Sequence, residues 1–120
     1  MALVFRGDLP EMTRAKSEVQ AAHAAFEAAV NLAKDNPDLL AAYMADNQPK
    51  IGLEAEGQEH LLKIVEKAKK REVPVTVITD AGRTIFEGPT MTCAIIGPMS
   101  KTDSNSITRG TRMRDKEPSQ

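Results

Sequence analysis

Short apolar runs in the chain have the length and composition of buried strands. Residues 2–5 form a continuous apolar run, and residues 75–79 and 92–96 are rich in β-branched side chains. Residues 50–55 alternate between apolar and polar positions, as expected of a strand with one buried face. The pattern therefore predicts four strands.

Apolar residues at helical spacing predict three helices between these strands. The first runs from about residue 17 to 34, and we expect its Val19, Phe26 and Val30 to form the face that packs on the sheet. Asn36-Pro37-Asp38 ends this helix and can cap a shorter second one. The third helix spans residues 58–71, where one face is apolar.

This order of elements, β-α-α-β-α-β-β, predicts an α/β fold. The helical connections are long enough for parallel crossovers, so we expect the strands near 2–6, 50–55 and 75–79 to be parallel neighbours. No helix fits between residues 80 and 91, so the last strand, 92–96, should return antiparallel. The predicted sheet is mixed, mainly parallel and four-stranded. Residues 1–110 should form one domain, and the polar residues 111–120 a flexible tail.

Composition narrows the function classes. Sixteen Lys and Arg against seventeen Asp and Glu give a net charge of −1, which disfavours a whole-molecule electrostatic grip on nucleic acid but leaves a local basic patch open. Three Phe, one Tyr and no Trp disfavour binding of RNA by base stacking. Cys93 is the only cysteine, as expected in the reducing cytoplasm, and no apolar run is long enough for a membrane span. His23 and His60 are too isolated to predict a metal, and no motif predicts a cofactor.

Polar residues at the start of the first helix are the first candidates for a site. Lys16, Gln20 and His23 share one helix face. Lys16 opposes the helix dipole without an evident structural gain, so a functional role is a good alternative. For Gln20 we favour a capping box with Ser17, and for His23 a half-buried side chain bonded to backbone.

Asp80-Ala81-Gly82-Arg83-Thr84 follows the most β-branched strand and is the second candidate. Asp and Gly are ordinary turn residues, which is one interpretation. Ligand sites in open α/β sheets gather at the carboxyl ends of strands, and there a carboxylate could orient water while threonine hydroxyls hold an ester oxygen.

Two further features have simple structural explanations. The basic cluster on the third helix fits a solvated face, with a phosphate-contacting edge as the alternative; its members are Lys63, Lys67, Lys69, Lys70 and Arg71. Cys93, in the middle of a predicted strand with no histidine placed to activate it, fits a core residue better than a nucleophile.

Taken in order, these segments resemble the class II peptidyl-tRNA hydrolases. The matching segments are LVFRGDL (3–9), Met12, TRAK (13–16), SEVQAAHAA (17–25), QPK (48–50), DAGRT (80–84), Thr92-Cys93, Gly97-Pro98 and SIT (106–108). Each motif is short, but they occur collinearly over roughly residues 3 to 108. The family has Gly-Lys-Gly-Lys where this chain has Thr13-Arg14-Ala15-Lys16, which predicts a less flexible loop here.

The resemblance implies a three-layer α/β/α fold, often dimeric, and hydrolysis of the ester between peptide and tRNA without metal or cofactor. The catalytic positions that it implies are Lys16, Asp80, Thr84 and Thr92, which we expect to line one cleft. We expect contacts with the substrate, at the tRNA 3′ end, from Arg14, Gln20, His23, Arg83, Lys67 and Lys70. The alternative is a non-catalytic member of the same fold that binds tRNA, a nucleotide or a protein partner; retention of all four catalytic positions favours the enzyme.

Overall fold

The computed structural model describes residues 1–81 and 89–114 of the 120-residue chain. The elements in this part follow the predicted alternation of strands and helices, with two additions near the C-terminus. They are β1 (Ala2–Arg6), α1 (Arg14–Asp35), α2 (Pro37–Ala45), β2 (Ile51–Ala55), α3 (Gln58–Lys70), β3 (Val75–Asp80), β4 (Thr90–Ile96), α4 (Lys101–Ile107) and β5 (Arg112–Met113).

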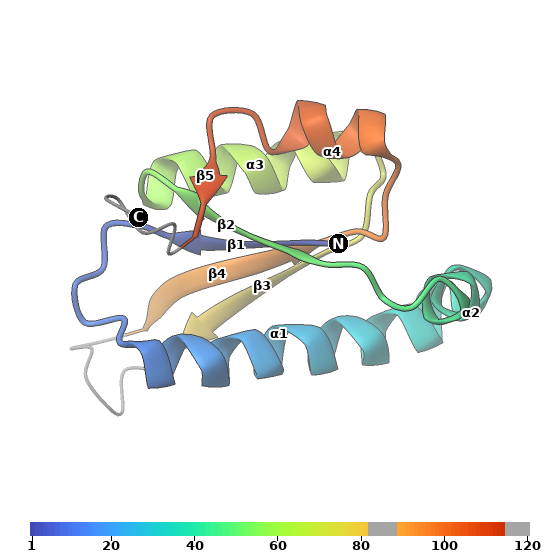
Figure 1. Cartoon of the computed structure of the whole chain (residues 1–120), viewed down its shortest axis with the longest axis horizontal. Coiled ribbons are helices and arrows are strands. Elements are labelled where there is room, and N and C mark those ends of the chain that lie inside the picture. Colours follow the sequence, from blue (N-terminus) through green and yellow to red (C-terminus); the bar gives the residue numbers. More distant parts are fainter. Residues whose placement is uncertain (82–88, 115–120) are drawn as a thin grey trace.

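A mixed sheet with the strand order β3-β4-β1-β2-β5 forms the middle layer. One face of the sheet is covered by α1, with α2 packed beside the end of that helix, and the other face is covered by α3 and α4 (Figure 1). The predicted α/β class and the layered arrangement are therefore confirmed.

The direction of each predicted strand was right, but one neighbour relation was wrong. β1 and β2 pair in parallel, whereas β4 is antiparallel to both β1 and β3 and lies between them. The predicted parallel neighbour of β1 on that side, β3, is therefore displaced to the edge of the sheet. The physical reason is the short link between Asp80 and Thr90, which favours pairing of consecutive antiparallel strands over a crossover.

The predicted count of four strands was also wrong, because β5 pairs antiparallel with β2. Both of its residues are exposed, and contacts of neighbouring arginine side chains hold it in place. Arg112 and Arg114 both donate to the carboxylate of Glu54, at 2.9 and 3.2 Å. Arg114 also donates to Ser17 Oγ at 2.6 Å and stacks over the Phe5 ring. β5 lies within the segment 111–120 that was predicted to be a flexible tail. Residues 115–120 lie outside the described part, and for them the flexible tail stays a prediction.

The face of α1 that packs on the sheet is not the predicted one. Val19, Phe26 and Val30 are 52, 73 and 46% exposed. The residues that α1 buries are mostly small or polar: Ser17, Gln20, Ala24, Ala28 and Leu32. Small side chains let the helix lie close to the sheet, whose own apolar residues fill this half of the core.

The other half of the core matches the prediction. Leu61, Ile64, Val65 and Ala68 are the buried face of α3, and they pack with Val4 and other apolar strand residues into one cluster. In the described residues, no helix is both long enough and apolar enough to cross a bilayer.

The two arginines that bind Glu54 allow a matched test of how β5 is held. Arg114 has only 17% of its side chain exposed, and Arg112 has 76%. Because Arg114 also bonds Ser17 and covers Phe5, we expect Arg114→Ala to lower the free energy of unfolding by about 1–3 kcal/mol. Arg112→Ala should cost at most about 1 kcal/mol, since an exposed ion pair contributes little. Urea unfolding followed by circular dichroism measures both, and equal losses would contradict this account.

Candidate active site

An ion pair joins the first turn of α1 to the end of β3. Lys16 Nζ contacts Asp80 Oδ2, and the two side chains are only 17 and 8% exposed. Removing two charges from water costs several kcal/mol, so a nearly buried ion pair contributes little to stability in comparison with apolar side chains. Such a pair at the carboxyl end of a strand is therefore a candidate for chemistry.

Local structure explains how Lys16 reaches this position. Thr13 is the N-cap of α1, and its hydroxyl accepts a hydrogen bond from the Lys16 amide at 3.2 Å. The helix thus begins at Arg14, three residues earlier than predicted, and its first turn contains no acidic residue. The ammonium of Lys16 therefore pairs with the carboxylate of Asp80 on β3, and not with a carboxylate in the first turn of α1.

The ion pair lies in a cleft of about 720 Å³ between α1 and β3. The cleft extends from the first turn of α1 past its middle and along the second half of β3. It is lined by Lys16, Val19, Gln20, His23, Phe26, Glu27, Val30, Val77, Ile78, Thr79, Asp80 and Ala81. The predicted convergence of Lys16 and Asp80 on one cleft is present.

Gln20 and Thr92 form a second link between α1 and the sheet. Gln20 Nε2 donates to Thr92 Oγ1 at 3.0 Å, and the same hydroxyl donates to the Ile78 carbonyl at 3.3 Å. The preferred interpretation of Gln20 as a capping-box partner of Ser17 was therefore wrong. Thr92 is completely buried on β4 and does not line the cleft, so it supports the cleft through Gln20.

The other predicted residues near the start of α1 are exposed. His23 is exposed and lines the cleft, so the prediction that it is half-buried was wrong. Arg14 has 91% of its side chain exposed and pairs with Glu18 at 3.2 Å. Arg83 and Thr84 lie outside the described residues.

Lys67 and Lys70 are not brought to this cleft. Both belong to the last turn of α3, which covers the opposite face of the sheet (Figure 1). Lys67 Nζ donates to the Ser106 carbonyl at 3.3 Å, on α4. Their position separates them from the group of residues around Lys16.

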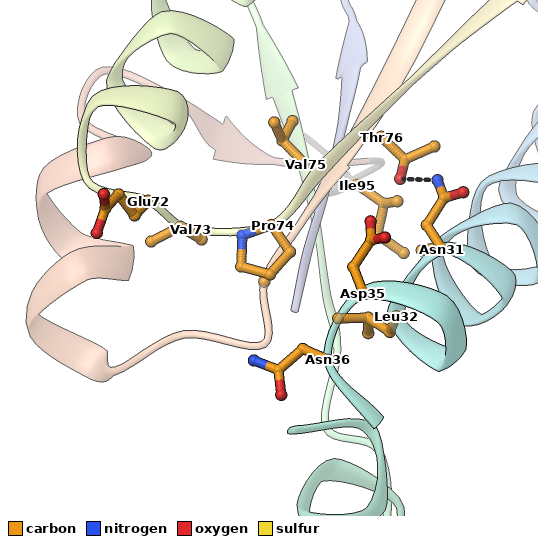
Figure 2. A pocket seen from close by; sticks show the side chains of 12 residues that line it. Asn31, Leu32, Asp35, Asn36, Glu72, Val73, Pro74, Val75, Thr76 and Ile95 are labelled. Atoms are coloured by element: carbon orange, nitrogen blue, oxygen red, sulfur yellow. Dashed lines mark hydrogen bonds between the residues drawn. The ribbon is translucent and has the colours of Figure 1, made fainter. Parts of the chain in front are cut away.

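A second hollow, of about 360 Å³, lies at the other end of α1 and contains none of the predicted residues (Figure 2). Asp35 and Glu72 contribute carboxylates to its lining, and Asn31 bonds Thr76 at 3.3 Å. Carboxylates repel phosphate, so this hollow is a poor site for a nucleic acid. The cleft with the ion pair is the better candidate.

The chemistry available in the cleft is acid–base and electrostatic. No three His, Cys, Asp or Glu side chains within residues 1–81 and 89–114 gather into a group that could hold a metal ion. A carboxylate can orient and deprotonate water, and an ammonium beside it can stabilise an oxyanion. Sequence reasoning missed the Gln20–Thr92 link, although the stripe Ser17, Gln20, Ala24 and Ala28 has helical spacing and could have indicated it.

The chain matches the protein family described as Peptidyl-tRNA hydrolase PTH2 over residues 1–113. Curated relatives named "Peptidyl-tRNA hydrolase" include one from Metallosphaera sedula, 38% identical over 100 residues that cover 82% of this chain and 85% of the relative. One from Staphylothermus marinus is 36% identical over 106 residues, covering 88 and 87%. One from Thermococcus onnurineus is 34% identical over 96 residues, covering 80% of each chain.

Ester hydrolysis can also proceed through a cysteine nucleophile, so the state of Cys93 can be tested directly. Cys93 is fully buried, and this burial raises the pKa of its thiol to about 11. At pH 8 the thiol is therefore neutral and inaccessible, and we expect no alkylation of the native protein by iodoacetamide. Mass spectrometry should detect the adduct only after unfolding in urea. Rapid labelling of the folded chain would contradict this placement.

Proposed function

Because the chain belongs to the peptidyl-tRNA hydrolase PTH2 family and hydrolyses the ester of peptidyl-tRNA, we propose that Lys16 and Asp80 carry out this reaction. The observation that supports this proposal is their nearly buried ion pair in the cleft between α1 and β3. Preorganised charges in a site that excludes most water act more strongly on a developing charge than the same groups in bulk water.

The proposed reaction uses one water molecule and both side chains. Asp80 accepts a proton from water, whose oxygen attacks the ester carbonyl carbon. Lys16 stabilises the negative charge that develops on the carbonyl oxygen. The bond from carbonyl carbon to ribose oxygen then breaks, and the ribose oxygen takes up the proton held by Asp80. Free tRNA leaves, and the peptide acid loses its remaining water-derived proton to solvent and leaves as a carboxylate.

The two threonines predicted to be catalytic, Thr92 and Thr84, have different roles in this proposal. Thr92 acts on the cleft only through Gln20, because its hydroxyl is buried and already bonded on both sides. We assign it a positioning role. Thr84 lies outside the described residues, and its catalytic role stays a prediction.

The tRNA would approach the cleft from the start of α1. Arg14 is exposed there, one turn or less from the ion pair, and can contact a phosphate near the 3′ end. Lys67 and Lys70 are not part of this proposal, and their contact with substrate stays a prediction. We place the protein in the cytoplasm, where translation supplies peptidyl-tRNA; a homodimer also stays a prediction.

The role of Asp80 is tested by Asp80→Asn. We expect kcat to fall by a factor of about 10²–10⁴, because the amide cannot accept the proton from water. KM should change little, since the amide keeps the size of the carboxylate. The assay follows loss of acid-insoluble counts from N-acetylated aminoacyl-tRNA.

Asp46→Asn is the matched control, since Asp46 is exposed at the end of α2 and distant from the cleft. Circular dichroism must show both variants folded, because Asp80→Asn leaves Lys16 without this partner. Full activity of Asp80→Asn would refute the proposed chemistry. Wild-type protein that binds peptidyl-tRNA without cleaving it would favour the non-catalytic alternative.

Arg14→Glu tests the direction of tRNA approach. We expect KM to rise about tenfold at low salt, and the slope of log KM against log salt concentration to fall by about one, because one phosphate contact is lost. Lys34→Glu makes the same change of charge about 30 Å away along α1 and should have little effect. Equal effects of the two changes would mean that only net charge matters.

A further inference from the structure

Three exposed apolar residues of α1 extend the cleft away from the ion pair: Val19, Phe26 and Val30. We call these three residues the apolar wall. They line the same cleft as Lys16 and Asp80, so a molecule bound at the ion pair can continue directly along the wall.

The strand beside this wall has an open edge. β3 pairs with β4 along one side, and no strand among the described residues pairs with its other side. An edge strand presents unpaired N–H and C=O groups in alternation. From Val75 to Thr79 the strand contains no charged residue and no proline, which are the usual means of blocking such an edge.

The charges along the wall indicate which part of the substrate it binds. Peptidyl-tRNA consists of a polyanionic RNA and a peptide, joined at the ester. Beyond Lys16 and Asp80, the ionisable residues that line the cleft are Glu27 and His23. A phosphate backbone needs several cations and avoids a carboxylate, whereas a peptide fits an apolar surface.

We propose that the peptide part of the substrate lies along the apolar wall and adds to the open edge of β3 as an extra strand. This inference rests on the proposed function of Lys16 and Asp80. Pairing through the main chain does not depend on peptide sequence, while pockets beside the strand add contacts for apolar side chains. Such binding suits a hydrolase whose substrates carry peptides of many sequences.

The position of the ester fixes the direction of the added strand. The ester carbonyl belongs to the C-terminal residue of the peptide and lies at Asp80, the last residue of β3. The rest of the peptide then extends toward Val75, so the peptide runs parallel to β3. The lining part of the strand, Val77 to Ala81, is about 13 Å long and accommodates about four extended residues.

The test uses the wild-type protein and a series of N-acetylated peptidyl-tRNAs that carry one to six alternating alanine and valine residues. We expect kcat/KM to rise at least about tenfold from one to about four residues and then to level off. Phe26→Glu and Val30→Glu should remove this gain, so in these variants kcat/KM should fall more for the four-residue than for the one-residue substrate. Leu62→Glu is the control, because Leu62 is similarly exposed on α3, across the sheet.

A second measurement separates strand pairing from simple apolar contact. Single N-methyl groups placed along a four-residue peptide should reduce kcat/KM at alternate positions only, since every second amide of an added strand faces β3. An equal effect at all positions, or none, would overturn the pairing with β3.

Other results of these experiments overturn either this inference alone or the proposed function as well. Cleavage that is independent of peptide length, or a gain that persists in Phe26→Glu, overturns this inference alone. Light scattering that shows a wild-type dimer and a Phe26→Glu monomer also overturns it, because the wall would then contact a second copy of the chain. A wild-type protein that cleaves none of the substrates overturns the proposed function, and this inference with it.

Discussion

The close packing of α1 on the sheet is the constraint on which the site depends. Ala24 and Ala28 face the strands, so the helix axis can approach β3 and β4 closely. At this separation Gln20 reaches the Thr92 hydroxyl, and Lys16 reaches Asp80. Larger side chains in the stripe would separate the helix from the strands and break both contacts. The same packing turns Val19, Phe26 and Val30 outward.

This arrangement places polar groups where they contribute little to stability. The amide of Gln20 bonds Thr92, and the ammonium of Lys16 contacts Asp80. Each contact satisfies a group that would otherwise be costly to bury, and none adds apolar burial. A valine or leucine stripe would have given a more stable helix–sheet contact but no preorganised charges. The stability that α1 forgoes is therefore linked to the chemistry of its first turn.

Element types were predictable from the sequence because strand and helix periods differ, and the antiparallel last strand followed from the absence of a helix before it. Which strands are neighbours was not predictable in the same way, because periodicity does not encode on which side of β1 a strand inserts.

The predicted packing face of α1 was wrong because two stripes share the helical period, and hydrophobicity favours Val19, Phe26 and Val30 over the alanines. β5 was missed because side chains such as Arg114, rather than apolar burial, hold it. Lys16 and Asp80 were predictable as candidates, but the link from Gln20 to Thr92 depends on the spatial position of β4.

Basic and apolar residues occupy different turns of α1, and this separation also bears on how the ester is oriented. The first turn of α1 carries Arg14 and Lys16, and the following turns carry the apolar wall. RNA and peptide differ most in charge, so in the proposed function each half of the substrate is favoured at a different end of the cleft. A substrate placed in reverse would set phosphates against Glu27 and move them away from Arg14. The proposed roles of Arg14 and the apolar wall therefore imply one orientation of the scissile bond relative to Asp80, independently of the sequence of the peptide or the tRNA.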